Sequence, residues 1–328
     1  MTRTSTSDIG KVALGSTGLS ISRLCFGLAP LGDMPDTYGY GVSIEQAHAT
    51  VRAIFDSNIN FLDTSRNYGL GKSEARIGEV IKERGGIPPG FVISSKIDRD
   101  FDTRKFDGAR ARQSLEQSLK ALNVSKIQLL HLHDPEHVLD IKDVTKPGGA
   151  LTELFKMKEE GLCDAVGLAA GVVDIMMPLM RDWDFDAIIT HNRFTLVNRN
   201  AAEMMDLAVA RGMAVLNAAP YAAGVLAKGT ANHARYVYQK ATPETLAPVV
   251  RVEEICARHG IPPGAAALQF SMRDPRVAST VVGISKPERI RQTIEWAEYP
   301  IPQAAWNELM ALPFESGDPE ATRVWTPG

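Results

Sequence analysis

FLDTSRNYG, residues 61–69, lies at the end of an apolar run that begins at Ile59 and turns polar at Asp63. Strands buried in a parallel β-barrel have this pattern where they end at the face that carries the catalytic groups. The polar half of the segment then holds Tyr68, followed by Gly69. We therefore expect the Asp63 carboxylate and the Tyr68 phenol to lie at one rim of a barrel.

Two later segments end in the same way. FVISSK, residues 91–96, ends at Lys96, and IQLLHLH, residues 127–133, ends at His133. His131 lies two residues earlier and therefore shares a strand face with His133. We assign His133 to the rim because it is nearer the strand end and is followed by Asp-Pro. We interpret His131 as a hydrogen-bonded histidine of the core.

These four residue types suit a proton relay. A tyrosine phenol has an ordinary pKa near ~10, and it needs a neighbouring cation to favour its phenolate at neutral pH. Lys96, held by Asp63, would supply that cation, and His133 would hydrogen-bond the substrate oxygen. Tyr68 would take or give the proton while a hydride moves at the adjacent carbon. The sequence thus predicts an oxidoreductase site of Asp63, Tyr68, Lys96 and His133, without a metal.

The rest of the chain alternates strand-like and helix-like segments. The expected barrel strands are residues 24–27, 59–62, 91–96, 127–133, 163–168, 187–190, 213–218 and 278–282. Apolar stripes with helical spacing separate them, for example at residues 202–211 and 252–259. About eight strand-then-helix units predict an α/β fold, a closed (β/α)8 TIM barrel. Because no linker-like composition divides the chain, we expect residues 1–328 to form one domain.

Three long segments are predicted to lie at the carboxyl-terminal face of this barrel. Residues 28–42 and 219–243 are too long for simple connections, and the tail spans residues 300–328. Their candidate side chains over the barrel mouth are Met34, Tyr38, Tyr40, Trp306, Phe314 and Trp325. The alternative is that these aromatic residues only pack the loops and the tail onto the surface.

The composition limits the classes of function. The chain has 328 residues, 44% of them hydrophobic and 23% charged, and its net charge of −3 argues against nucleic-acid binding. The first residues, MTRTSTSDIG, are polar, and no run reaches ~18 uninterrupted apolar residues, so we expect a cytoplasmic protein without a membrane partner. Cys25, Cys163 and Cys256 have no metal-binding spacing and are expected to be buried thiols.

The segments FLDTSRNYG, SSK and LLHLHDPE resemble those of the aldo-keto reductase family. The family's catalytic tetrad corresponds to Asp63, Tyr68, Lys96 and His133, in this order, and the resemblance covers nearly the whole chain. Residues 11–22 have the signature of a β-hairpin around Ser16-Thr17-Gly18, and the resemblance implies that this hairpin plugs the barrel floor. It also implies a nicotinamide cofactor and a small aldehyde or hemiacetal substrate.

The expected cofactor site lacks a Rossmann signature, because no GxGxxG follows a strand. VVGISKPERI, residues 281–290, instead reads as a strand, a glycine and a helix N-terminus with hydroxyl and basic groups, which together attract phosphate. It is similar to the family's adenosine-phosphate signature, in which NADP-using members tend to have a basic residue at the position of Gly283. The resemblance therefore implies NAD rather than NADP, although Lys286 and Arg289 could also meet a 2′-phosphate. The residues expected to bind the cofactor here are Gly283, Ser285, Lys286 and Arg289, with Gly224 and Leu226 of GVLAKG over the pyrophosphate.

Two residue pairs depart from the family pattern. Ala169-Ala170 stand where many members have a Ser-Asn pair that holds the nicotinamide amide, and Gln292-Thr293 replace a Glu-Asn pair that holds adenine. Asn192 is the candidate substitute for the first pair.

The segments GLAPLGDMPDTYGYG, NYGLGKSEARIGE and NAAPYAAGVLAKG are similar to those of a branch of sugar and pyridoxal dehydrogenases. That branch oxidises a cyclic hemiacetal to a lactone, and no thiohemiacetal-forming cysteine is needed, because the reacting carbon already carries C–H and O–H. The resemblance favours pyridoxal, oxidised to 4-pyridoxolactone, with L-fucose or a D-threo-aldose as the alternative substrate. A hypothesis from another class is a non-catalytic, nicotinamide-binding redox sensor of a membrane channel. The sequence favours the enzyme, because it has no extended basic arm and has Gly283 at the cofactor position.

Overall fold

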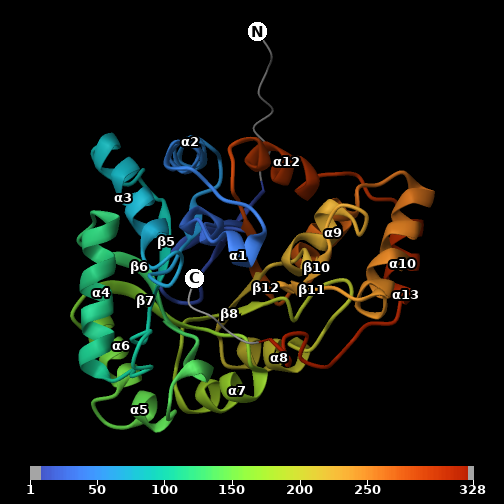
Figure 1. The fold of residues 1–328 in the computed structure, drawn as a ribbon. Coiled ribbons are helices and arrows are strands. Elements are labelled where there is room, and N and C mark those ends of the chain that lie inside the picture. The colour runs from blue at the N-terminus through green and yellow to red at the C-terminus, as the bar shows by residue number, and fades with distance from the viewer. Residues whose placement is uncertain (1–8, 324–328) are drawn as a thin grey trace.

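Eight parallel strands close into a barrel in the computed structural model, which describes residues 9–323 (Figure 1). In chain order they are β3 (Leu24–Gly27), β4 (Phe61–Asp63), β5 (Val92–Ile97), β6 (Ile127–His133), β7 (Cys163–Ala169), β8 (Ala187–His191), β9 (Ala214–Ala218) and β12 (Val277–Gly283). The ring closes where β12 pairs with β3, with Thr280 opposite Leu24 and Gly283 opposite Gly27. The predicted (β/α)8 barrel is confirmed.

Helices surround the barrel strands (Figure 1). The longer ones are α2 (Ile44–Phe55), α3 (Lys72–Arg84), α4 (Gly108–Leu122), α6 (Ala150–Glu159), α7 (Val173–Asp182), α8 (Ala202–Ala210), α10 (Pro243–His259), α11 (Pro263–Arg273), α12 (Glu288–Ala297) and α13 (Gln303–Ala311). Their apolar stripes pack on the outward side chains of the strands, such as Leu62, Leu130 and Val166, in one large core. Among the helices of residues 9–323, none is both long and apolar enough to cross a lipid bilayer.

The predicted hairpin plugs one end of the barrel. Strands β1 (Lys11–Ala13) and β2 (Ser20–Ser22) pair in antiparallel register around a turn in which Gly18 has φ +81°, a left-handed value that suits glycine. Leu14 and Ile21 are fully buried in an inner core shared with Phe61 and Leu129 of the barrel. This end is therefore sealed by apolar packing, and the opposite end is left to carry the site.

Three long connections contain more regular structure than the sequence suggests. Residues 28–42 include η1 (Ala29–Gly32) and α1 (Pro35–Tyr38), and the segment after β6 includes η2 (Pro135–His137) and α5 (Lys142–Thr145). Residues 219–243 include η3 (Ala222–Gly224), α9 (Val225–Lys228) and a small ladder of β10 (Arg235–Tyr236) with β11 (Gln239–Lys240). These short elements hold the long connections in defined positions at the rim.

Two aromatic side chains of the tail do not lie where the sequence predicted, over the barrel mouth. Trp306 is 3% exposed and belongs to the core between helices, while Phe314 is 45% exposed on the surface. Neither lies over the barrel mouth, and Trp325, like residues 1–8, lies outside the described residues. The tail instead reaches the mouth through charged residues, of which Asp318, Glu320 and Arg323 line the cavity.

Candidate active site

A cavity of about 830 Å³ lies at the carboxyl ends of the barrel strands, within the ~300–1,000 Å³ usual for ligand sites. Every strand contributes a last or next-to-last residue to its lining: Gly27, Asp63, Lys96, His133, Ala169, His191, Ala218 and Gly283. Tyr68 lines it as well, so all four predicted catalytic residues lie in one cavity. Gly224, Ser285, Lys286 and Arg289 line the same cavity.

Asp63 and Lys96 form a buried ion pair. Lys96 Nζ lies 2.7 Å from Asp63 Oδ2 and 2.7 Å from the carbonyl oxygen of Thr64. Ser94, which is paired with Asp63 across β4 and β5, donates its hydroxyl hydrogen to Asp63 Oδ1 at 2.8 Å. The two charged side chains are 2% and 6% exposed, so each charge depends on the other for its stabilisation.

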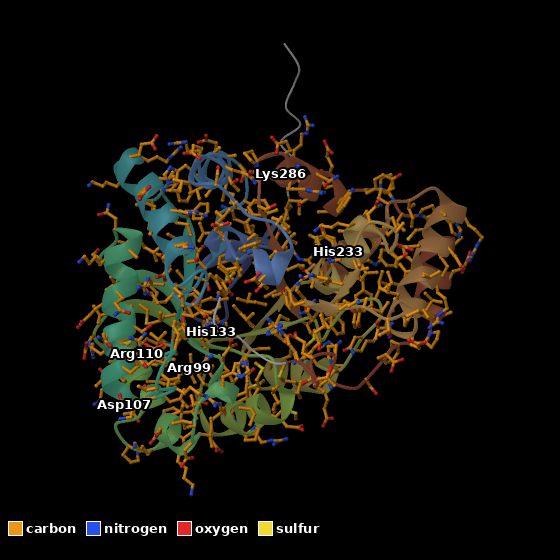
Figure 2. All side chains as sticks on the ribbon, in the orientation of Figure 1. Arg99, Asp107, Arg110, His133, His233 and Lys286 are labelled. Carbon is orange, nitrogen blue, oxygen red and sulfur yellow. The ribbon has the colours of Figure 1, made fainter. Side chains whose placement is uncertain are left out.

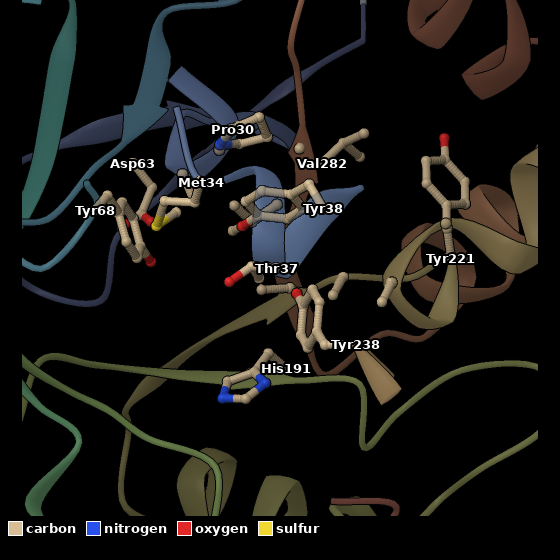
Figure 3. A pocket seen from close by; sticks show the side chains of 18 of the residues that line it. Pro30, Met34, Thr37, Tyr38, Asp63, Tyr68, His191, Tyr221, Tyr238 and Val282 are labelled. Atoms are coloured by element: carbon tan, nitrogen blue, oxygen red, sulfur yellow. The ribbon is translucent and has the colours of Figure 1, made fainter. Parts of the chain in front are cut away.

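Tyr68 is placed by a close approach of two loops. A Cβ atom at Gly69, where φ is +62°, would lie 1.9 Å from the carbonyl oxygen of Gly32, and one at Gly32 would lie 2.7 Å from the carbonyl carbon of Tyr68. Glycine at both positions therefore allows the loop after β4 to pack against the loop after β3. The Tyr68 ring then lies beside Asp63 in the cavity (Figure 3), with its centroid 4.8 Å from Lys96 Nζ.

The neighbouring cation does not bring the pKa of Tyr68 below its ordinary value, although the sequence analysis expected that it would. Burial raises the pKa of the Tyr68 phenol well above its ordinary value, and the negative charge of Asp63 raises it further. Lys96 directs its ammonium group to Asp63 and to Thr64, and it faces the ring of Tyr68. The phenol therefore keeps its proton at neutral pH.

His133 contacts a carboxylate that the sequence analysis did not identify. Its Nδ1 lies 2.6 Å from Asp98 Oδ1, and Asp98 is completely buried. Asp98 follows Lys96 by two residues at the end of β5, so both side chains point to the same side of the strand. The two-residue spacing from Lys96 could have revealed it. Among residues 9–323, no group of three or more His, Cys, Asp or Glu side chains is arranged to hold a metal ion.

His131 is a core residue, but it is not the hydrogen-bonded histidine that was expected. It is fully buried and does not line the cavity, and neither ring nitrogen has a hydrogen-bond partner among the described residues. Its ring packs over Gly167, where a Cβ atom would lie 2.2 Å from Nδ1. Burial lowers the pKa of His131 well below its ordinary value, and the charges of Lys96 and His133 lower it further. His131 is therefore a neutral side chain packed in the barrel.

The lining of the cavity includes three cationic side chains besides Lys96. They are Lys228, Lys286 and Arg289, and within residues 9–323 none of them forms an ion pair with a carboxylate. Burial lowers the pKa of Lys228, and the charge of Arg289 lowers it further. In Figure 2, Lys286 lies beside α12, whereas His133 lies in the barrel, well apart from Lys286. Neighbouring cations without carboxylate partners would be stabilised by the phosphates of a dinucleotide, so this part of the cavity fits such a cofactor.

Two of the predicted cofactor residues have side chains elsewhere. Leu226 is fully buried in the core, and Asn192 is fully buried with its Nδ2 donating to Glu320 Oε1 at 2.9 Å. Neither is among the residues that line the cavity. Ala169 and Ala170 line it but have no side-chain polar group.

The mouth of the cavity is lined by aromatic side chains and by charged residues of the tail. Met34, Tyr38 and Tyr40 line it as predicted, and the loop residue Tyr238 packs edge-on against Tyr38 with ring centroids 6.0 Å apart (Figure 3). Glu320 ties the tail to the loop after β8, because its Oε1 lies 3.1 Å from His191 Nδ1 and 3.2 Å from Arg193. Burial opposes ionisation, but the contacts with His191, Arg193 and Arg323 hold the pKa of Glu320 below its usual range.

Comparison with known proteins gives consistent results. The model of the Aldo/keto reductase family matches residues 23–312. D-threo-aldose 1-dehydrogenase of a Pseudomonas species is 32% identical over 324 residues, which cover 90% of this chain and 95% of that protein. Pyridoxal 4-dehydrogenase of Microbacterium luteolum is 30% identical over 338 residues, which cover 91% and 96%. The solved structure of the aldo-keto reductase AKR11C1 from Bacillus halodurans, in its holo form, superposes with a TM-score of 0.76 at 19% identity and covers 96% of this chain and all of that one.

Proposed function

Because this chain belongs to the aldo/keto reductase family and is an oxidoreductase acting on CH–OH groups, we propose that it oxidises a cyclic hemiacetal to a lactone with NAD. The observation that carries the proposal is that Asp63, Tyr68, Lys96 and His133 line the same cavity as three cations without carboxylate partners, of which Lys286 lies well apart from His133 (Figure 2). Such a cavity suits a small alcohol-like carbon beside the four residues and phosphates beside the cations. The alternative of a non-catalytic redox sensor has less support, because relatives named as voltage-gated potassium channel subunits beta are 20–23% identical, against 30–32% for the two dehydrogenases.

A nicotinamide cofactor, when bound, supplies the acceptor for the hydride. Lys228, Lys286 and Arg289 would hold its phosphates, with Gly283 at the end of β12 and Ser285 between β12 and α12 beside them. Because Ala169 and Ala170 offer no side-chain hydrogen bond, the nicotinamide end would be held by backbone groups and shape. These assignments follow from which residues line the cavity and from their charge.

Side chains of the protein would orient the substrate and accept its proton. His133 would hydrogen-bond the hydroxyl oxygen of the hemiacetal and orient it. Tyr68, once it has released its own proton to solvent, would take the hydroxyl proton as the hydride leaves the same carbon. Lys96 balances the charge of Asp63, which would otherwise hinder ionisation of the phenol. The buried ion pair is thus proposed to control how readily Tyr68 exchanges its proton.

Pyridoxal is the substrate that we propose first, because pyridoxal 4-dehydrogenase of M. luteolum is similar over nearly the whole chain. An aldose is the second candidate, because D-threo-aldose 1-dehydrogenase is similar over the same length at 32% identity. The faces of Tyr38 and Tyr238 suit a pyridine ring or the C–H face of a sugar. Assays with NAD and pyridoxal, L-fucose or D-arabinose would separate them.

The first product is expected to be a lactone. The hydroxyl that closes the hemiacetal ring remains in the molecule when the tetrad removes hydride and proton, so the product mass under non-hydrolysing conditions should be that of the lactone. Pyridoxal 5′-phosphate should not react, because its esterified hydroxyl cannot close the ring.

Cysteine variants provide the control for this route. Cys25, Cys163 and Cys256 are all buried, and burial raises the thiol pKa at each. Changing each to Ala should therefore preserve turnover, as should adding a chelator. If a free acid forms first, or a folded cysteine variant loses turnover, the reaction proceeds through a covalent thiohemiacetal and the proposal is wrong.

We expect kcat/KM to be higher with NAD than with NADP. A side chain at Gly283 has room, because a Cβ atom there would meet only Pro30, at 3.6 Å. Gly283→Lys would add a cation for a 2′-phosphate and should narrow the preference by roughly 1–2 kcal/mol, about 10-fold. Gly283→Met is the neutral control and should leave the ratio of kcat/KM with NAD to kcat/KM with NADP unchanged. A wild-type preference for NADP would assign 2′-phosphate binding to Lys286 or Arg289 instead.

A further inference from the structure

The Asp98 side chain is surrounded by hydrogen-bond donors. His133 Nδ1 lies 2.6 Å from its Oδ1, while its Oδ2 accepts from the Ser65 hydroxyl at 2.8 Å and from the Asn67 backbone N–H at 3.0 Å. Asp98 is 0% exposed, so water does not compete for these contacts. The Ser65 hydroxyl also lies 3.2 Å from His133 Nδ1, but its hydrogen is donated to Asp98 Oδ2. Because an ionised carboxylate only accepts hydrogen bonds, Nδ1 of His133 supplies the hydrogen of its contact with Oδ1.

We propose that Asp98 is a positioning residue that holds His133 as an Nδ1–H imidazolium, with Nε2–H directed into the cavity toward the substrate oxygen. This inference rests on the proposed role of His133 in binding that oxygen. Asp98 itself is not among the residues that line the cavity, so it acts through His133 and not on the substrate. Ser65 and the backbone of Asn67 fix the carboxylate in turn.

The charges around His133 support the imidazolium state. Its Nε2 lies 3.5 Å from Asp134 Oδ1, so a carboxylate faces each ring nitrogen. The titratable groups that surround it from the neighbouring segments are Tyr68, Lys96, Asp98, His131, Asp134 and His137. Burial lowers the pKa of His133, but the charges of Asp134 and Asp98 and the bond to Asp98 outweigh both burial and the charge of Lys96. The pKa of His133 is therefore raised.

An imidazolium at this position would promote oxidation by stabilising the charge that develops on the substrate oxygen. As the hydroxyl proton leaves for Tyr68, negative charge develops on the substrate oxygen, and a charged N–H donor stabilises that oxygen more than a neutral one. Asp98 would also stop the ring from rotating, so that Nε2 stays directed into the cavity. Without Asp98, the imidazole could lose its proton or adopt the other tautomer.

The test is nitrogen NMR of the histidine side chains in the protein without substrate or cofactor. The His133 signals can be assigned by their loss in His133→Asn. We expect the titration midpoint of wild-type His133 to lie above that of an ordinary histidine, with Nδ1 protonated on both sides of it, and Asp98→Asn to lower the midpoint by about one pH unit or more. Asp134→Asn is the matched control: it removes a similar charge but should leave the Nδ1–H tautomer in place above the midpoint. Ser65→Ala should likewise keep this tautomer.

A neutral Nε2–H tautomer in the wild type at neutral pH would overturn the proposal even if Asp98→Asn failed to fold. An unchanged His133 midpoint in folded Asp98→Asn would overturn it as well. Once a substrate is identified, Asp98→Asn should lower kcat by about 10-fold or more without weakening cofactor binding. Because the NMR measurements involve no turnover, they test the Asp98–His133 pair separately from the hemiacetal reaction. A protein with this pair intact that oxidised no hemiacetal would contradict only the proposed function.

Discussion

Tyr68→Phe is expected to lower kcat by at least ~10², the usual contribution of a general acid–base group, while cofactor binding stays almost unchanged. The change removes only the phenolic oxygen, and the ring that packs above Lys96 and near His133 remains. The cations that we expect to bind the phosphates are not changed. The measurements are steady-state kinetics and cofactor titration by fluorescence.

Two other phenols in the cavity serve as matched controls for Tyr68→Phe. Tyr38 and Tyr238 line the same cavity and lie close enough for their charges to influence Tyr68. Tyr38→Phe and Tyr238→Phe should each change kcat far less than Tyr68→Phe, since neither ring contacts the Asp63–Lys96 pair. Near-native turnover in Tyr68→Phe, with a large loss in one of the controls, would transfer the proton-transfer role to that control residue.

Lys96→Met is expected to reduce kcat at neutral pH by at least ~10² and to shift the remaining activity to higher pH. Lys96 forms an ion pair with Asp63 at 2.7 Å, and Asp63 is a charge that raises the pKa of Tyr68. Without the ammonium group, the full charge of Asp63 acts on the phenol. Tyr68 then holds its proton to a still higher pH. Oxidation requires the deprotonated oxygen, so its rate should increase by about tenfold per pH unit below the pKa of Tyr68.

The pH–rate profile of oxidation checks this prediction in wild type and variant. Both profiles should rise with pH, and the Lys96→Met profile should lie further toward alkaline pH. Because the variant leaves Asp63 buried without its partner, a loss of about 3–5 kcal/mol in the free energy of unfolding is expected, so thermal unfolding must be measured alongside. Lys96→Met/Asp63→Asn, which removes both charges, should recover stability and bring the profile back toward neutral pH. A folded Lys96→Met with an unshifted profile would contradict this role of the ion pair.

The fold was predictable because it depends on local patterns. Apolar runs that end in polar residues located eight strands to within one or two residues, and the glycine-containing signal at residues 11–22 located the plug. Strand ends in a parallel barrel converge on one face, so Asp63, Lys96 and His133 could be placed together without coordinates. Residues 281–290 likewise indicated cationic groups that line the cavity.

The features that were missed depend on contacts between segments distant in sequence. Glu320 reaches His191 and Arg193 from more than a hundred residues away, and no local pattern in the tail predicts this contact. Asn192 had a suitable side chain for a cofactor, but it bonds to Glu320. His131 had the residue type of a hydrogen-bonded core group, yet the space over Gly167 leaves its nitrogens without partners among residues 9–323.

By itself the sequence determined the (β/α)8 barrel and the rim on which the four predicted catalytic residues meet. It also located two of the cationic residues that line the same cavity, Lys286 and Arg289. Each of these follows from strand periodicity and residue type. Only the tertiary structure decided the protonation states. The pKa of Tyr68 is raised by burial and by the charge of Asp63, whereas the pKa of His133 is raised by two carboxylates, Asp134 and Asp98, that face its ring. Desolvation and Coulomb energy depend on burial and on distances of a few ångströms, and these exist only once the strands and loops have packed.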